Sequence, residues 1–81
     1  MIDDALHALH HAEKAVVDAQ GNPGSGEFQR AFQKLQLAKE QIKKHQNDEL
    51  DPEERHHLDL AAEQAIHLHE TLESLEDQGP L

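Results

Sequence analysis

Apolar residues recur along the chain at alternating intervals of three and four positions, which is the spacing of one face of an α-helix. Large residues fall seven positions apart, and smaller ones, mostly alanine, often stand three positions after them. We call these positions the seam. They are Ile2, Ala5, Leu9, Ala12, Val16 and Ala19; Phe28, Ala31, Leu35, Ala38, Ile42 and His45; and Leu58, Ala61, Ala65, Leu68, Leu72 and Leu75. Three stretches with this heptad pattern predict three amphipathic helices, each burying one face.

Helix-breaking residues separate the three stretches. Residues 21–26 are rich in glycine and contain a proline, and Ser25 there is the expected N-cap of the second helix. Further on, Asp51 precedes Pro52 in the order typical of a helix start, with an acceptor side chain followed by proline at the first helical position. The predicted helices span about residues 3–20, 26–46 and 52–77.

Three helices joined by short loops predict an all-α fold, a small antiparallel up-down-up three-helix bundle that forms one domain over residues 1–81. Alanine at every second seam position lets helix axes approach closely, so we expect the first two helices to be the tightest pair. His45 is the one histidine on the seam. It stands near the end of the second helix, where a protonated imidazole is favoured by the helix dipole, and we predict a capping role.

Acidic residues dominate the chain, whose formal charge is -10 with histidine neutral. Residues 27–45 carry five basic and two acidic side chains, whereas residues 51–81 carry one basic and nine acidic side chains. Because this acidity repels phosphate and the chain has only two aromatic residues for base stacking, we expect no nucleic-acid partner. No apolar run approaches the ~20 residues that span a bilayer, so we expect no membrane association and a cytoplasmic location.

Eight histidines make the chain unusually rich in groups that titrate near neutral pH. The seam places seven of them on outward faces. His7 and His11 are four positions apart, on one side of a helix, and such a pair binds divalent zinc, nickel or copper weakly. These two residues are the candidate metal ligands, and we expect no other cofactor.

Three further spacings in the third predicted helix combine glutamate and histidine, and in one of them Glu63 and His67 are four positions apart. Glu53 with His56 and Glu54 with His57 give the Glu-x-x-His motif, which resembles that of the di-iron carboxylate bundles. That family places its motif toward the bundle interior. Here the interior positions are apolar and the histidines lie off the seam, so we expect them to be solvated surface residues.

Catalysis has little support in the sequence. The chain lacks cysteine, Gly-x-Ser-x-Gly and His-Glu-x-x-His, and its glycine-rich segment leads into Glu27, which is unsuited to an anion. We therefore expect no catalytic residue and no enzymatic activity.

Large apolar residues off the seam are the stronger indication of function. Leu60, Ile66 and Leu37 fall on outward positions, and the first two are expected to give the third helix a second apolar stripe that a partner covers. The first hypothesis is therefore a small interaction or regulatory module that binds protein, as a homodimer, with helix 2 of one copy against helix 3 of the other. The alternative is a protein that binds divalent metal or responds to pH through its histidines. A third is an acidic mimic of nucleic acid.

Overall fold

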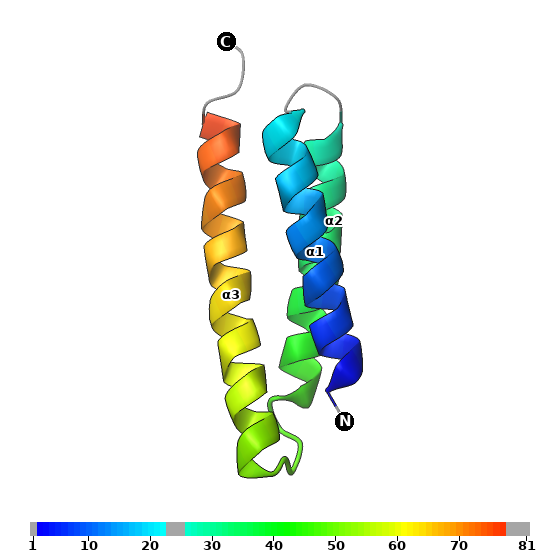
Figure 1. Ribbon diagram of the computed structural model, residues 1–81, viewed down its shortest axis with the longest axis vertical. Helices are drawn as coiled ribbons and strands as arrows, with labels where there is room; N and C mark the ends of the chain where they lie inside the picture. The colour runs from blue at the N-terminus through cyan, green and yellow to red at the C-terminus, as the bar shows by residue number, and fades with distance from the viewer. Residues whose placement is uncertain (1, 23–25, 78–81) are drawn as a thin grey trace.

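Three α-helices make up the fold in the computed structural model, which describes residues 2–22 and 26–77. They are α1 (Asp3–Gly21), α2 (Glu27–His45) and α3 (Pro52–Asp77). Successive helices run in opposite directions and pack side by side, and the described residues contain no strand (Figure 1). The predicted all-α, up-down-up bundle is confirmed, with each helix bound within one residue of that expected.

The seam forms the core. Sixteen of its eighteen residues are buried, and the other two, Phe28 and Leu75, are half-buried. Ala15 adds to the core from a position off the seam. The three largest side chains that are almost fully enclosed are Leu35, Leu58 and Leu72. Truncating any one of them to alanine is expected to cost about 2–5 kcal/mol of unfolding free energy, since both apolar burial and packing are lost.

The two alanine-rich helices pack most extensively against each other, as predicted. Ala5, Ala12 and Ala19 on α1 and Ala31 and Ala38 on α2 have no exposed surface. Because methyl groups leave little side chain between two backbones, α1 and α2 approach closely. α3 contacts both less extensively, since leucines occupy most of its seam and hold its axis farther away (Figure 1).

The two later helices begin in different ways. Gly26, just before α2, has a φ of +88°, a left-handed conformation that glycine adopts without strain. Ser25, the predicted cap, lies outside the described residues. The predicted cap of α3 is confirmed, because the backbone N–H of Glu54 donates to Asp51 Oδ1 at 2.8 Å.

None of the described helices is both long enough and apolar enough to span a membrane.

Candidate functional site

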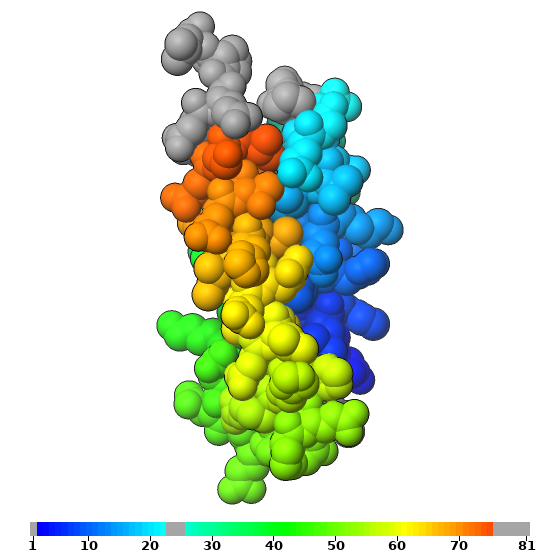
Figure 2. Space-filling model, turned by 60° about the vertical axis from the view of Figure 1, so that its left-hand side comes forward, coloured from blue at the N-terminus to red at the C-terminus, as the bar shows by residue number. Residues whose placement is uncertain are grey.

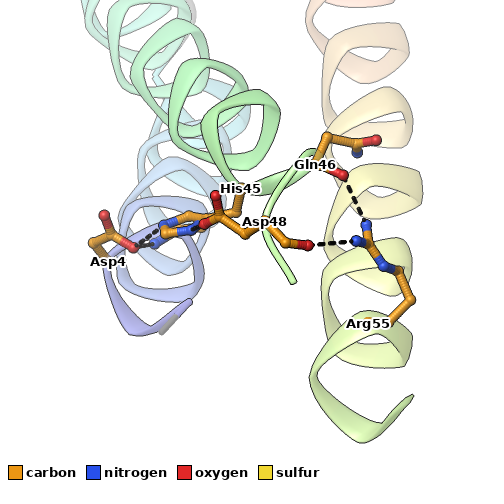
Figure 3. A network of polar contacts seen from close by, with 6 residues as sticks. Asp4, His45, Gln46, Asp48 and Arg55 are labelled. Atoms are coloured by element: carbon orange, nitrogen blue, oxygen red, sulfur yellow. Dashed lines mark hydrogen bonds and ion pairs between the residues drawn. The ribbon is translucent and has the colours of Figure 1, made fainter. Parts of the chain in front are cut away.

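A polar network links all three helices at one end of the bundle, where α1 begins, α2 ends and α3 begins (Figure 3). Its centre is the His45 ring, whose side chain is only 8% exposed. Nδ1 lies 2.7 Å from Asp48 Oδ2, and Nε2 lies 2.8 Å from Asp4 Oδ1. We call these three side chains the His45 bridge.

The geometry of the bridge requires a protonated imidazole. Ionised carboxylates only accept hydrogen bonds, and a neutral imidazole has a single N–H, so both contacts are satisfied together only when His45 is a cation. The hydrogen bond to Asp48, followed by the one to Asp4, raises the pKa of His45 above its ordinary 6.5, although burial opposes this. The hydrogen bond from His45, assisted by the backbone N–H of Ala5, lowers the pKa of Asp4 below its ordinary 3.8.

Antiparallel packing brings these charges together. Asp4 stands in the first turn of α1 and His45 is the last residue of α2, so each helix dipole favours the charge placed at its end. The capping prediction was right about this position and wrong about the contacts. The ring nitrogens bind carboxylates, while backbone N–H groups satisfy two of the last carbonyl groups of α2: Asp48 N–H donates to His45 O, and Gln46 N–H donates to Lys43 O.

Arg55, from the first turns of α3, holds the loop that presents Asp48. Its Nη1 donates to Gln46 O at 3.2 Å, and its Nη2 donates to Asp48 O at 3.0 Å (Figure 3). The guanidinium therefore fixes the backbone on one side of the loop while the Asp48 carboxylate binds His45 on the other. Sequence reasoning missed Asp4, Asp48 and Arg55; the available signal was the position of Asp48, three residues after a seam histidine.

This arrangement is suited to holding a proton and unsuited to transferring one to a substrate. Both nitrogens of His45 are occupied by carboxylates, which leaves no lone pair to act as a general base. What the bridge does chemically is link the ends of α1 and α2 through a charge that depends on pH.

The seven other histidines lie toward the outside, as the seam predicts; six are exposed, and His69 is partly covered. His7 and His11 are both exposed on α1. Within residues 2–22 and 26–77, no group of three or more histidine and acidic side chains is placed to hold a metal ion. A two-ligand site at His7 and His11 stays a prediction.

The acidic partners of the α3 histidines are neighbours on the outer surface of that helix. Glu53 lies 3.9 Å from His57, a spacing of four, and His67 lies 3.4 Å from Glu70. Among the contacts of the described residues, neither motif histidine is paired with the glutamate of its Glu-x-x-His motif. These are surface pairs, each contributing about 0–1 kcal/mol to stability when the histidine is charged.

Several open grooves run beside α3, and two of them contain predicted interface residues. The α2–α3 groove, of about 450 Å³, has an apolar floor and two lysines at its rim. It is lined by Lys39, Ile42, Lys43, Gln46, Asn47, Ala62, Ala65 and Ile66. The α1–α3 groove, of about 440 Å³, is lined by Leu6, Leu9, His57, Leu60, Ala61, Glu63, Gln64 and His67. Figure 2 shows α3 facing the viewer, between α1 on its right and side chains of α2 on its left.

The predicted interface residues are exposed but separated. Ile66 is 56% exposed in the α2–α3 groove, and Leu60 is 50% exposed in the α1–α3 groove. The prediction that Leu60 and Ile66 form one apolar stripe is therefore corrected, because side chains six positions apart point about 120° away from each other around a helix. Leu37, 47% exposed on α2, lines neither groove.

Toward the start of α2 and the end of α3, the surface between these two helices is polar and aromatic. Lys39 Nζ lies 3.5 Å from His69 Nδ1, and His69 Nε2 lies 3.5 Å from Glu73 Oε1. Phe32 contacts the same imidazole edge-on, with 5.9 Å between the ring centres. Because lysine only donates, His69 accepts this hydrogen bond at Nδ1. Lys39 is thereby held at the rim of the groove.

Comparison with protein-family models, with curated proteins and with solved structures found no match to this chain.

Proposed function

We propose that this chain is a small, non-catalytic helical module that acts in the cytoplasm by binding a partner protein along the α2–α3 groove. The observation that carries the proposal is Ile66, a large aliphatic side chain that is 56% exposed above the apolar floor of that groove. Single exposed apolar residues are common on proteins. Ile66 differs because buried or half-buried apolar side chains, Ile42, Ala62 and Ala65, continue from it into an open groove.

The form of the groove favours a protein segment over a small molecule. Small ligands generally bind in cavities that enclose most of their surface, whereas this groove is open to solvent along the side of two helices. An amphipathic helix lays its apolar face into such a groove. Lys39 and Lys43 at the rim favour a segment with acidic residues beside its apolar stripe.

Copurification from the native cell tests this function. The wild-type chain is expected to retain a specific protein, and Ile66→Asp is expected to lose it because a carboxylate would have to be desolvated in the groove. Leu37→Asp is the matched control, since it places the same charge on an exposed leucine outside the groove. Equal retention by the two variants would contradict the proposal.

A pH-responsive module is the second candidate, and the His45 bridge favours it. Loss of the His45 proton leaves a ring nitrogen facing a carboxylate oxygen, which loosens the contact between α1 and the end of α2. Partner affinity would then differ between about pH 6 and about pH 8.5 in the wild type and not in His45→Gln. An equal pH dependence in both proteins would rule out the bridge as its source.

A further inference from the structure

We infer that the occupant of the α2–α3 groove is a second copy of this chain, joined by a twofold axis that runs parallel to the helices. This inference rests on the proposed function, because it names the partner of the same groove. It is carried by the distribution of charge on this one face of the bundle, which is basic along α2 and acidic along α3.

The basic half of the face belongs to α2. Lys39 and Lys43 are one helical turn apart and both line the groove. Two other basic side chains, Arg30 and Lys34 in the first half of this helix, lie toward α1 and line the surface between α1 and α2. The lysines beside α3 are therefore a separate pair, and their long aliphatic stems offer apolar surface as well as charge.

The acidic half of the face belongs to α3. Helical geometry places Asp59, Glu70 and Glu73 within about 40° of Ile66 around the helix, and all three are exposed. Ile66 therefore stands within an acidic surface. Between it and the lysines lies the apolar floor formed by Ile42, Ala62 and Ala65.

Only one twofold arrangement pairs these charges. With two copies face to face, an axis across the helices would set α2 on α2 and α3 on α3, which places like charges against each other. An axis parallel to the helices sets α2 of each copy on α3 of the other, and opposite charges meet in both halves of the interface. Any net attraction must still exceed the repulsion between two chains of charge -10, so the apolar floor has to supply most of the affinity.

The same axis fixes which residues meet. Rotation about an axis parallel to the helices leaves every residue at its own height along the bundle. Lys39 lies 3.5 Å from His69 in its own chain, so it is level with Glu70 and would face Glu70 of the second copy. Ile66, one turn from Glu70, would pack against the stretch between Lys39 and Lys43. Lys43, one turn from Lys39, would be level with Ile66 of the second copy, in the stretch of α3 between Glu70 and Asp59.

Charge reversal with sedimentation velocity at micromolar concentration tests the arrangement. The wild type is expected to be a dimer. Lys39→Glu with Lys43→Glu, and separately Asp59→Lys with Glu70→Lys, are expected to weaken it at least tenfold. The first pair lowers the net charge from -10 to -14 and the second raises it to -6, so loss of the dimer in both excludes an effect of net charge alone. Circular dichroism verifies that each variant is helical.

The variant with all four substitutions decides the direction of the axis. It restores the wild-type net charge and again places opposite charges against each other in the parallel-axis dimer. Its dimer affinity is therefore expected to return to within a few-fold of wild type. Arg30→Glu with Lys34→Glu, which reverses two charges on the other side of α2, is the matched control and should leave the dimer intact.

Each contrary outcome has a definite meaning. A monomeric wild type overturns the inference, and if Ile66 still governs retention of another protein, the proposed function stands without it. A dimer that survives both pairs of reversals, or a four-site variant that stays monomeric, overturns the interface proposed here. If no protein, the second copy included, binds the wild-type chain in a way that depends on Ile66, the proposed function itself is overturned.

Discussion

The His45 side chain is held at both ends of its ring, because its two nitrogens bind carboxylates from two different parts of the chain. The raised pKa of His45 means that its contribution to stability is fully present below pH 6.5 and is lost as pH rises through the folded-state pKa. The lowered pKa of Asp4 gives a contribution that is present above pH 3.8 and is lost as pH falls through its own folded-state pKa. The bridge therefore stabilises the fold most between these two values.

Replacing His45 with glutamine should make stability less dependent on pH. The melting temperature of the wild type is expected to fall between about pH 6 and about pH 8.5, and the difference between the wild type and His45→Gln is expected to shrink over the same range. Thermal unfolding followed by circular dichroism measures both. Protonation of surface histidines also reduces repulsion at low pH, so His10→Gln, at an exposed position, serves as the control. Parallel curves for wild type and His45→Gln would show that the bridge contributes nothing.

The pair His7 and His11 carries a second prediction at this scale. Both side chains are exposed, one helical turn apart, so their imidazoles are free to chelate one ion without rearrangement of the core. We expect weak nickel or zinc binding in calorimetric titration that is lost in the double variant His7→Ala with His11→Ala. The adjacent pair His56 and His57, replaced in the same way, is the control because neighbouring positions diverge by about 100° around a helix. Unchanged binding in the first double variant would remove this site.

Only part of the His45 bridge could be predicted from the sequence pattern, for a physical reason. The seam places His45 inward, and an antiparallel pair of helices brings the start of α1 beside the end of α2, so contact with Asp4 follows from the fold. Asp48 is different, because the direction of its side chain depends on the backbone of residues 46–51. That segment has no periodicity and takes its conformation from the contacts with Arg55.

At the scale of the elements, helix starts and faces were predictable because each depends on nearby residues. Asp51 and Pro52 mark the start of α3, and the hydrogen bond from the Glu54 backbone N–H to the Asp51 side chain confirms it. The seam predicted burial equally well, because every helix here has a single apolar face. Three described residues depart from the seam: Phe28 and Leu75 lie on it and are half-buried, and Ala15 lies off it and is 6% exposed. Close packing of α1 against its neighbours widens the buried strip at Ala15.

Removing the α3 cap should cost a measurable part of the stability. Asp51→Ala leaves the N–H of Glu54 without its side-chain acceptor and removes a negative charge from the helix start, so the free energy of unfolding is expected to fall by about 1 kcal/mol. Chemical denaturation measures the change. Glu49→Ala removes a charge from an exposed position in the same loop and should change stability by less than about 0.5 kcal/mol. Similar losses in both variants would point to loop charge and away from the cap.

At the scale of the whole molecule, the sequence pattern leaves one choice open. A three-helix bundle has two mirror-related arrangements, in which the third helix docks on either side of the first two, and the heptad pattern suits both. The arrangement observed sets Ile66 toward α2 and Leu60 toward α1. In the other arrangement these neighbours would be exchanged, and Ile66 would not lie beside Lys39 and Lys43. Which apolar residue meets which charge is therefore a property of the fold.

The His45 bridge has a further consequence for the folding reaction itself. Between pH 6.5 and the raised pKa of His45, the folded chain holds a proton on this ring that the unfolded chain releases. Hydrogen ion is thus a reactant in folding over that range. The heat measured on unfolding should accordingly vary with the ionisation enthalpy of the buffer, and a weakly buffered solution should become more acidic as the protein melts.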